Sequence, residues 1–240
     1  MSEHGRAPKV GRRCFAGALA LWAALPGPTR AANDVDVGAV RVPRVDVSRL
    51  PEPGSYSLRR LMRAPDGEVL ASDGRAQRLH QLLRGRFTVL SFMYTYCRDS
   101  LGCPLAWRAM EMARAELKSN PALARRSQLI SLSFDPSNDT PEQMRLYGGA
   151  RALDPQVRWQ FLTTASVPKL LPLLREFGQD VSVETDTKGR PTRTLNHLLK
   201  LFLIDDALQV REVYSVGTLD PQAIVNDLRT LQLAGRQMTR

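Results

Sequence analysis

Two cysteines, Cys97 and Cys103, are the residues of this chain best suited to chemistry. An apolar run of strand length, residues 87–94, precedes them, and residues 104–117 carry apolar side chains at helical spacing. Pro104 is favoured in the first turn of a helix, so we expect Cys103 at a helix N-terminus, where the helix dipole would favour its thiolate. A strand that delivers two thiols to the start of a helix indicates a site for metal or redox chemistry.

The spacing of the two cysteines prevents them from sharing one face of a helix. Six steps along a helix turn the second residue by about 240° from the first. Cys97 is therefore expected in a loop, and residues 98–102 must fold back to bring the sulfurs together, with Gly102 providing some freedom. The alternative is one small structural disulfide, which would stabilise little because it closes a short ring.

A histidine late in the chain completes a candidate ligand set. His197 follows a polar stretch and immediately precedes the apolar run of residues 198–204. Two thiolates and an imidazole suit copper, and thiolates select copper(I); zinc would want a fourth ligand. Taken alone, His197 would be interpreted as an exposed loop residue. His80 is expected on the solvated face of a short helix, and we do not interpret it as a ligand.

Apolar runs and helical patterns alternate along the rest of the chain. Strands are expected at 127–134, 157–162, 198–204 and 209–216, helices at 75–84, 141–151, 166–177 and 222–233, and hairpins at 56–71 and 181–194. This order predicts an α/β fold: a thioredoxin-like sheet flanked by helices, with an N-terminal extension and a β-hairpin insertion. In such a sheet the loop that holds His197 lies beside the cysteine loop, which favours its interpretation as a ligand.

The N-terminus has the parts of an export signal. Arg12-Arg13 precede an apolar run, residues 14–25, which is followed by small residues and is short for a membrane span. We therefore expect a periplasmic or exported protein, anchored to the inner membrane if the leader is not cleaved. The expected organisation is a leader at 1–31, a linker at 32–53, a thioredoxin-like domain at 54–235 and a basic tail at 236–240.

The net charge of +10 does not by itself indicate a nucleic-acid-binding protein. Part of the excess lies in the leader, and the rest is scattered over the sequence. No stripe of arginines is interleaved with aromatic residues, as a nucleic-acid interface would show. A soluble basic surface is the preferred interpretation.

The motifs taken together resemble the Sco/SenC family, copper-binding assembly factors of cytochrome oxidase with a thioredoxin-like fold. The resemblance rests on the strand that leads to Cys97, on Cys103-Pro104, on residues 133–136 with residues 139–142, and on His197 before residues 201–205. It covers residues 54–233. The chain has five residues between its cysteines, where three are commoner in the family.

The resemblance implies copper bound by Cys97, Cys103 and His197. It also implies that Asp135 and Asp139 flank the site as supporting residues, with helix capping as the alternative role for both. The implied function is a metallochaperone that delivers copper to the copper-receiving subunit of a respiratory oxidase or to another periplasmic copper protein.

A second function remains open, that of a thiol–disulfide reductase. Cys97 and Cys103 would then form a reversible disulfide and keep the cysteines of a copper-protein partner reduced. The thioredoxin-like oxidoreductases have a cis-proline where this chain has His197, which favours the metallochaperone. A peroxidase fits poorly, because Thr95 is too close to Cys97 for the threonine-bearing loop of such enzymes.

Overall fold

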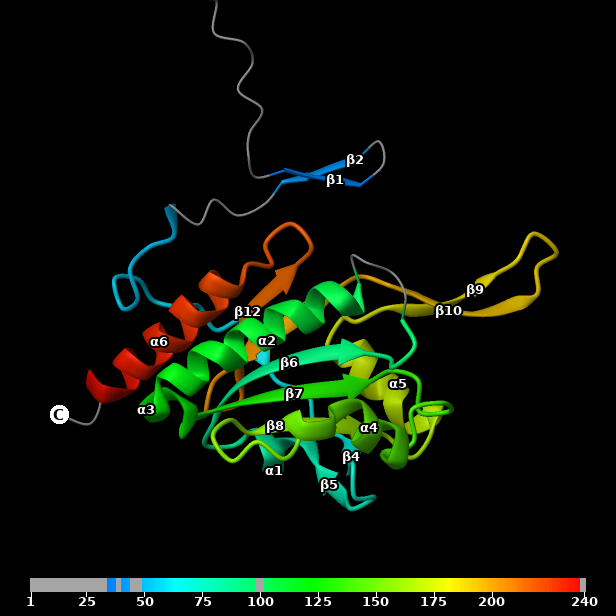
Figure 1. Cartoon of the computed structure of the whole chain (residues 1–240), viewed down its shortest axis with the longest axis horizontal. Coiled ribbons are helices and arrows are strands. Elements are labelled where there is room, and N and C mark those ends of the chain that lie inside the picture. The colour runs from blue at the N-terminus through cyan, green and yellow to red at the C-terminus, as the bar shows by residue number, and fades with distance from the viewer. Residues whose placement is uncertain (1–33, 38–39, 44–48, 98–101, 238–240) are drawn as a thin grey trace, which may run out of the picture. The chain divides into compact units, whose positions relative to one another are not determined.

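A mixed eight-stranded sheet forms the centre of the molecule (Figure 1). The structure is a computed structural model that describes residues 34–37, 40–43, 49–97 and 102–237. The strands of this sheet are β3 (Met62–Arg63), β4 (Glu68–Ala71), β5 (Ala76–Arg78), β6 (Phe87–Met93), β7 (Ser127–Ser133), β8 (Trp159–Thr163), β11 (Lys200–Ile204) and β12 (Gln209–Ser215). Their order across the sheet is β3-β12-β11-β6-β7-β8-β4-β5.

The central strands β6, β7 and β8 are parallel to one another. Every residue of β6 and β7 is buried, as expected for parallel strands that are covered on both faces. Phe87 pairs with Ser127 and Met93 with Ser133, so β6 and β7 begin and end level with each other. Their carboxyl ends therefore meet at one edge of the sheet, and the loops that follow them lie side by side.

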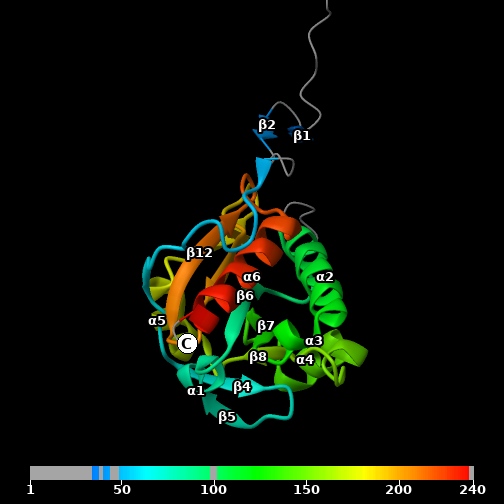
Figure 2. The same cartoon turned by 90° about the vertical axis from the view of Figure 1, so that its left-hand side faces the viewer.

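Helices cover both faces of the sheet (Figure 2). They are α1 (Leu79–Leu83), α2 (Cys103–Ser119), α3 (Pro121–Ala124), α4 (Pro141–Gly148), α5 (Val167–Glu176) and α6 (Pro221–Gln237), with a 3-10 turn at Gly149–Arg151 after α4. Trp107 of α2 and Tyr147 of α4 both contact the ring of Phe161 in β8, so these helices share a face. On the other face Phe177, at the end of α5, packs against Phe92 of β6.

Local sequence explains where α2 and α4 begin. Pro104 and Pro141 lie in the first turns of the two helices, where the missing N–H has no cost. The Thr140 side chain caps α4 by accepting a hydrogen bond from the Gln143 N–H at 3.3 Å. Gly148 ends α4 where it approaches Phe161 so closely that a Cβ would lie 2.6 Å from the ring.

A separate two-stranded hairpin extends from the main sheet. It consists of β9 (Val181–Thr185) and β10 (Pro191–His197), which pair only with each other among the described strands. Figure 1 shows it projecting beyond the arrowheads of β6 and β7. This hairpin matches the expected polar insertion at 181–194.

The expected α/β fold is confirmed, but the hairpin at 56–71 is wrong. β3 pairs with β12 at one edge of the sheet, whereas β4 pairs with β5 and β8 near the opposite edge. Pro65-Asp66-Gly67 therefore lies in the connection that takes the chain from one side of the main sheet to the other. It does not form a turn between two paired strands. In the expected helix at 75–84, the first residues instead form β5.

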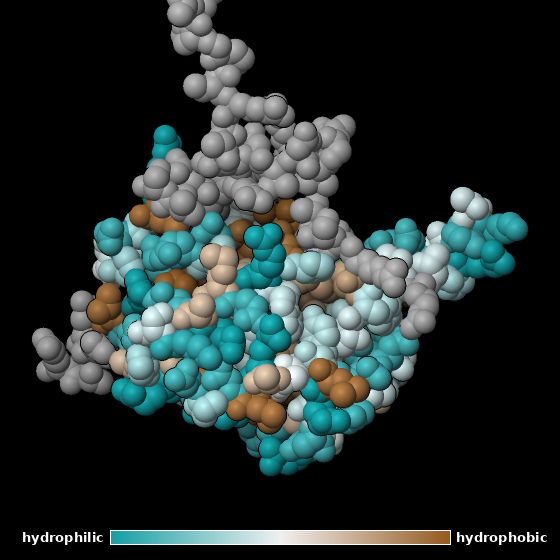
Figure 3. Space-filling model, viewed as in Figure 1, coloured by the Kyte–Doolittle hydropathy of each residue, from teal (hydrophilic) through white to brown (hydrophobic). Residues whose placement is uncertain are grey.

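The N-terminal part of the chain is described only in pieces. Within the expected linker, β1 (Asp34–Val37) and β2 (Val40–Pro43) pair with each other in antiparallel fashion. The expected leader at 1–31 lies outside the described residues. No helix in the described part of the chain is long and apolar enough to cross a membrane. The face seen in Figure 3 is largely hydrophilic, with apolar side chains in small separate groups.

Candidate metal centre

Cys97, Cys103 and His197 come together at the carboxyl edge of the parallel strands. One ligand atom from each residue lies within 4.8 Å of the other two. Cys97 is half-buried in the loop after β6, where its N–H bonds the Tyr94 carbonyl oxygen at 3.3 Å. Cys103 is the first residue of α2 and is 4% exposed, and His197 is the last residue of β10. Both cysteines are free thiols.

One ring nitrogen of His197 makes a hydrogen bond within the protein, and the other is available to bind a metal ion. Its Nδ1 lies 2.9 Å from the Leu195 carbonyl oxygen. A carbonyl only accepts, so this contact places the proton on Nδ1 and leaves a lone pair on Nε2. Nε2 is buried and has no hydrogen-bond partner among the described residues. A buried nitrogen with a free lone pair beside two thiols fits a metal ligand, because an unpaired buried polar atom is otherwise unfavourable.

Two aromatic rings pack against the imidazole of His197. The His197 ring lies 4.6 Å from the ring of Phe134 and 5.8 Å from that of Tyr94, measured between centroids. The Tyr94 hydroxyl also hydrogen-bonds Cys97, and burial raises the pKa of Tyr94 above its ordinary range. Tyr94 therefore contacts both the thiol and the imidazole side of the group and is a donor at neutral pH.

The expected thiolate at Cys103 is wrong for the metal-free protein. The pKa of Cys103 is raised, because its hydrogen bond with Cys97 and its burial both favour the protonated thiol. The start of α2 does not overcome these two effects. A bound cation would reverse them, since a metal ion deprotonates a coordinating thiol.

Asp139 ties the cysteine loop to the neighbouring strand. Its carboxylate accepts hydrogen bonds from the Thr95 N–H at 3.1 Å, the Thr95 hydroxyl at 2.5 Å and the Ser133 hydroxyl at 2.6 Å. The side chain is fully buried, and this burial raises the pKa of Asp139 despite the three donors. Asp139 thus fixes the loop two residues before Cys97.

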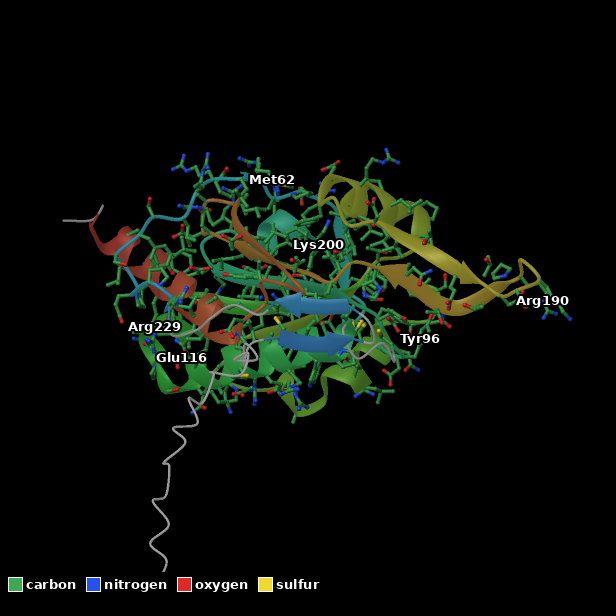
Figure 4. The ribbon with its side chains drawn as sticks, turned by 90° about the horizontal axis from the view of Figure 1, so that it is seen from above. Met62, Tyr96, Glu116, Arg190, Lys200 and Arg229 are labelled. Atoms are coloured by element: carbon green, nitrogen blue, oxygen red, sulfur yellow. The ribbon has the colours of Figure 1, made fainter. Side chains whose placement is uncertain are left out.

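Asp135 makes a similar connection nearer the surface. It accepts hydrogen bonds from the Tyr96 hydroxyl and from Asn138 Nδ2, the latter at 2.6 Å. Figure 4 shows Tyr96 at the same end of the molecule as the hairpin that carries Arg190. The cap of α4 is Thr140, so the helix-capping alternative for Asp135 and Asp139 is wrong.

A family model described as SCO1/SenC matches residues 68–232, more than half of the chain. The chain belongs to the SCO1/SenC family. The resemblance identified from the sequence is thereby confirmed. A search of curated proteins found no match to this chain.

Solved structures of Sco proteins share the fold of this SCO1/SenC chain. ScoI of Arabidopsis thaliana with copper bound is 18% identical, with a TM-score of 0.59 over 72% of this chain and 99% of that one. Yeast Sco1 with copper bound is 16% identical, with a TM-score of 0.55 over 74% and 94%. BsSco, described as a cytochrome c oxidase assembly protein with a disulfide switch, is 20% identical, with a TM-score of 0.54 over 73% and 98%. These identities establish the shared thioredoxin-like fold alone.

The structure adds residues to the SCO1/SenC site that the sequence did not indicate. Tyr94, Thr95 and Ser133 bond either a thiol or the carboxylate that holds the thiol loop. In the sequence these residues appear only as hydroxyl side chains near the ends of two strands, β6 and β7. That pattern becomes informative only once the two strands are known to pair in parallel.

His80 lies outside the group. Its Nε2 is 2.6 Å from the Ala64 carbonyl oxygen, and its side chain is only 19% exposed, so it is less solvated than expected.

Proposed function

We propose that this protein is exported and binds copper through Cys97, Cys103 and His197. It delivers the copper to, or helps assemble, the copper centre of a respiratory cytochrome oxidase. Copper is the cargo of this function. Membership of the SCO1/SenC family supports the proposal, as do the copper-bound structures of ScoI from Arabidopsis thaliana and Sco1 from yeast.

The observation that carries the proposal is the donor set itself. Two thiols and an imidazole lie within 4.8 Å of one another, and the imidazole presents a buried Nε2 without a protein partner. Soft sulfur donors and a neutral imidazole favour copper(I). A zinc site of the structural kind would need a fourth protein ligand, and the group contains three residues in the described part of the chain.

Binding must release protons, because metal ligands act in their deprotonated form. Cys103 is a protonated thiol in the metal-free protein, and it loses that proton as copper binds. His197 needs no such change, because its tautomer already presents the Nε2 lone pair. Transfer to a recipient proceeds by exchange of ligands one at a time. His197 is the first to leave, because it belongs to the hairpin β9–β10 and not to the main sheet.

The proposed partner is the copper-receiving subunit of a respiratory oxidase or another periplasmic copper protein. The description of BsSco as a member of a family of cytochrome c oxidase assembly proteins supports the first. Export rests on the basic and apolar pattern of residues 12–25. An uncleaved leader would keep the protein at the inner membrane.

Metal analysis of the reduced, purified protein tests the proposal. We expect one copper per chain and, for copper(II), strong thiolate-to-metal charge-transfer absorption. Cys97→Ser or Cys103→Ser should abolish the band, and His197→Ala should weaken and shift it. His80→Ala is the matched control, because His80 lies outside the group, and it should change neither. A band and an affinity that survive His197→Ala would exclude the three-ligand site.

The second candidate function is a thiol–disulfide reductase. It is favoured by two free thiols whose sulfurs lie within 4.8 Å of each other. The disulfide switch named for BsSco also supports it. Counting thiols in buffers of defined glutathione potential would measure the midpoint of the Cys97–Cys103 pair. A pair that stays reduced in oxidised glutathione would exclude this function and leave copper binding untouched.

A further inference from the structure

An arginine directly precedes each of the three parallel strands, at the edge of the sheet opposite the cysteines. Arg86 precedes β6, Arg126 precedes β7 and Arg158 precedes β8. Phe87 pairs with Ser127 and Leu129 with Trp159, so the three arginines lie along one edge. In Figure 1 the arrowheads of β6 and β7 point away from this edge, toward the hairpin.

The row continues to the far side of the sheet. β12 runs parallel to β6, because each is antiparallel to β11. Arg63 of β3 pairs with Gln209, the first residue of β12, so it lies at the same edge. From β3 to β8 the strand order contains five steps, which at about 4.8 Å each span roughly 24 Å. Arg84 and Arg125 lie in the turns just before β6 and β7.

These arginines are short of counter-charges. Arg126 pairs with Asp206 at 2.9 Å. The other five, Arg63, Arg84, Arg86, Arg125 and Arg158, have no carboxylate partner among the residues that the structure describes. Elsewhere most cations of this part of the chain are paired: Arg114 with Asp154, Arg145 with Glu142 and Arg190 with Asp186 are examples. Five cations without a carboxylate partner in the described part of the chain therefore lie together along one edge of the sheet.

Two of the unpaired arginines, before strands that only β7 separates, also repel each other. Burial and the charge of Arg86 both lower the pKa of Arg158. Arg86 donates to the Arg125 carbonyl oxygen at 3.0 Å, and Arg158 to Gln160 Oε1 at 3.2 Å, so both are held by neutral acceptors. Like charges held together without an anion are unfavourable, and a bound anion would remove that cost.

We propose that this arginine edge, formed by Arg63, Arg84, Arg86, Arg125, Arg126 and Arg158, binds the anionic phosphate groups of a phospholipid bilayer. Guanidinium groups match phosphate oxygens in a two-pronged geometry. A row of roughly 24 Å is longer than one phosphate and suits an array of headgroups. This interaction is separate from the copper site and from the leader.

The position of the edge argues against the copper recipient as its occupant. A recipient must reach Cys97, Cys103 and His197, which lie at the carboxyl ends of the strands, whereas the arginines lie at the amino ends. A partner docked on the arginines would therefore leave the thiols open on the other side. Binding to a bilayer there would direct the site away from the membrane, toward partners in solution or projecting from the membrane.

Vesicle sedimentation with the full chain tests the proposal. Vesicles of phosphatidylcholine alone are compared with vesicles that contain phosphatidylglycerol. The double variant Arg86→Gln/Arg158→Gln removes two unpaired charges. The control Arg145→Gln/Arg190→Gln removes the same net charge at two ion-paired positions. Any contribution of the leader is identical in all three proteins, and thermal unfolding verifies that each is folded.

We expect the wild-type protein to prefer the anionic vesicles and to be released by salt. The double variant should bind them roughly 30-fold more weakly, about fivefold for each arginine near the surface, while the control stays within about twofold. Equal binding by the two variants, or no preference for anionic vesicles, would overturn the proposal. Competition by millimolar inorganic phosphate would also overturn it, because it would indicate a small-anion site.

The orientation has its own test, which needs no copper. Alkylation of the reduced thiols by a charged, water-soluble maleimide should proceed at the same rate with and without anionic vesicles. Protection of the thiols by vesicles would show that the end of the molecule with the cysteines, and not the arginine edge, faces the bilayer.

Discussion

The candidate copper site is built from two regions that the molecule holds in different ways. The cysteine region is the carboxyl end of β6 with the start of α2, and the histidine region is the hairpin β9–β10. The first belongs to the buried main sheet, and the second forms a sheet of its own. One site therefore combines two ligands from the buried main sheet and its first flanking helix with one ligand from a separate hairpin.

Buried polar groups hold the cysteine region. Asp139 accepts three hydrogen bonds from Thr95 and Ser133, and Asp135 accepts one from Tyr96. Cys103 is itself part of the hydrophobic core. A change that loosens this region should therefore affect both folding and metal binding.

Fewer contacts hold the histidine region. β9 is mostly exposed, and close to His197 the fold is fixed by Gln179 Nε2, which donates to the Leu198 carbonyl oxygen at 2.9 Å. The Nε2 atom of His197 has no partner in the described part of the chain. We therefore expect this region to supply or withdraw a ligand at little cost to the stability of the fold, as the proposed release of copper requires.

The largest effect should follow from Asp139→Ala in the cysteine region. The change leaves the N–H and hydroxyl of half-buried Thr95 and the buried Ser133 hydroxyl without their acceptor. We expect the free energy of unfolding to fall by about 3–5 kcal/mol. Urea unfolding measures it, with the exposed Glu142→Ala as the control from the same loop and helix. If Asp139→Ala lowers the free energy of unfolding no more than Glu142→Ala does, the buried hydrogen bonds of Asp139 do not stabilise the cysteine region.

The sequence was sufficient for the elements whose signals are local. β6, β7 and α2 follow from apolar patterning, and the start of α4 follows from Thr140 and Pro141. The proximity of His197 to the cysteines follows from the sheet order. These features need only short-range propensity and the alternation of strands and helices.

The sequence was insufficient to predict features that depend on contacts with residues distant in the chain. Pro65-Asp66-Gly67 has the composition of a hairpin turn, but the strands around it pair with β12 and with β5 and β8. The protonation of Cys103 depends on Cys97 and on burial, which outweigh the helix N-terminus. The role of Asp139 depends on Thr95, which lies 44 residues away in the chain.

We expect a smaller effect of the cysteine region on how the stability of the fold depends on pH. The pKa of Asp139 is raised above 3.8 by burial, with the charge of Asp135 acting in the same direction. In the window between 3.8 and that raised value, the folded state binds more protons than the unfolded state. The contribution of Asp139 to stability therefore falls as pH rises through the window and is constant above it.

Asp139→Asn isolates this contribution, because asparagine does not titrate. We expect the stability advantage of the wild-type protein over the variant to shrink as the pH rises from about 4 to 7. Urea unfolding at several pH values gives the difference. An advantage that grows over this range would mean that the three hydrogen bonds outweigh burial.

Shortening the hairpin should change stability less. Replacing residues 184–194 by Asn-Gly keeps the pairs of Val183 with Leu195 and of Val181 with His197, joined by a favoured two-residue turn. We expect the free energy of unfolding to change by less than about 1 kcal/mol, because mostly exposed residues are removed. Copper stoichiometry and the charge-transfer band should persist. Loss of the band in a folded variant would show that the outer hairpin also positions His197.

The smallest effect concerns the residue that joins the two regions. Tyr94 bonds Cys97 through its hydroxyl and contacts the His197 ring with its own ring, at 5.8 Å between centroids. Tyr94→Phe keeps the ring contact and removes only the hydroxyl. We expect copper to bind with the same stoichiometry and the fold to remain intact.

The thiolate-to-copper(II) band should nevertheless move to lower energy in Tyr94→Phe. A hydrogen bond to a ligating sulfur stabilises its lone pair, so its removal raises the energy of the donor orbital and narrows the gap to the metal. Tyr96→Phe is the matched control, since its hydroxyl bonds Asp135. Absorption spectra of the three copper(II) proteins decide the matter. A shift in Tyr94→Phe alone would show that the cysteine region tunes the metal through a residue that also contacts the histidine. Equal spectra would mean that the two regions meet only through the copper.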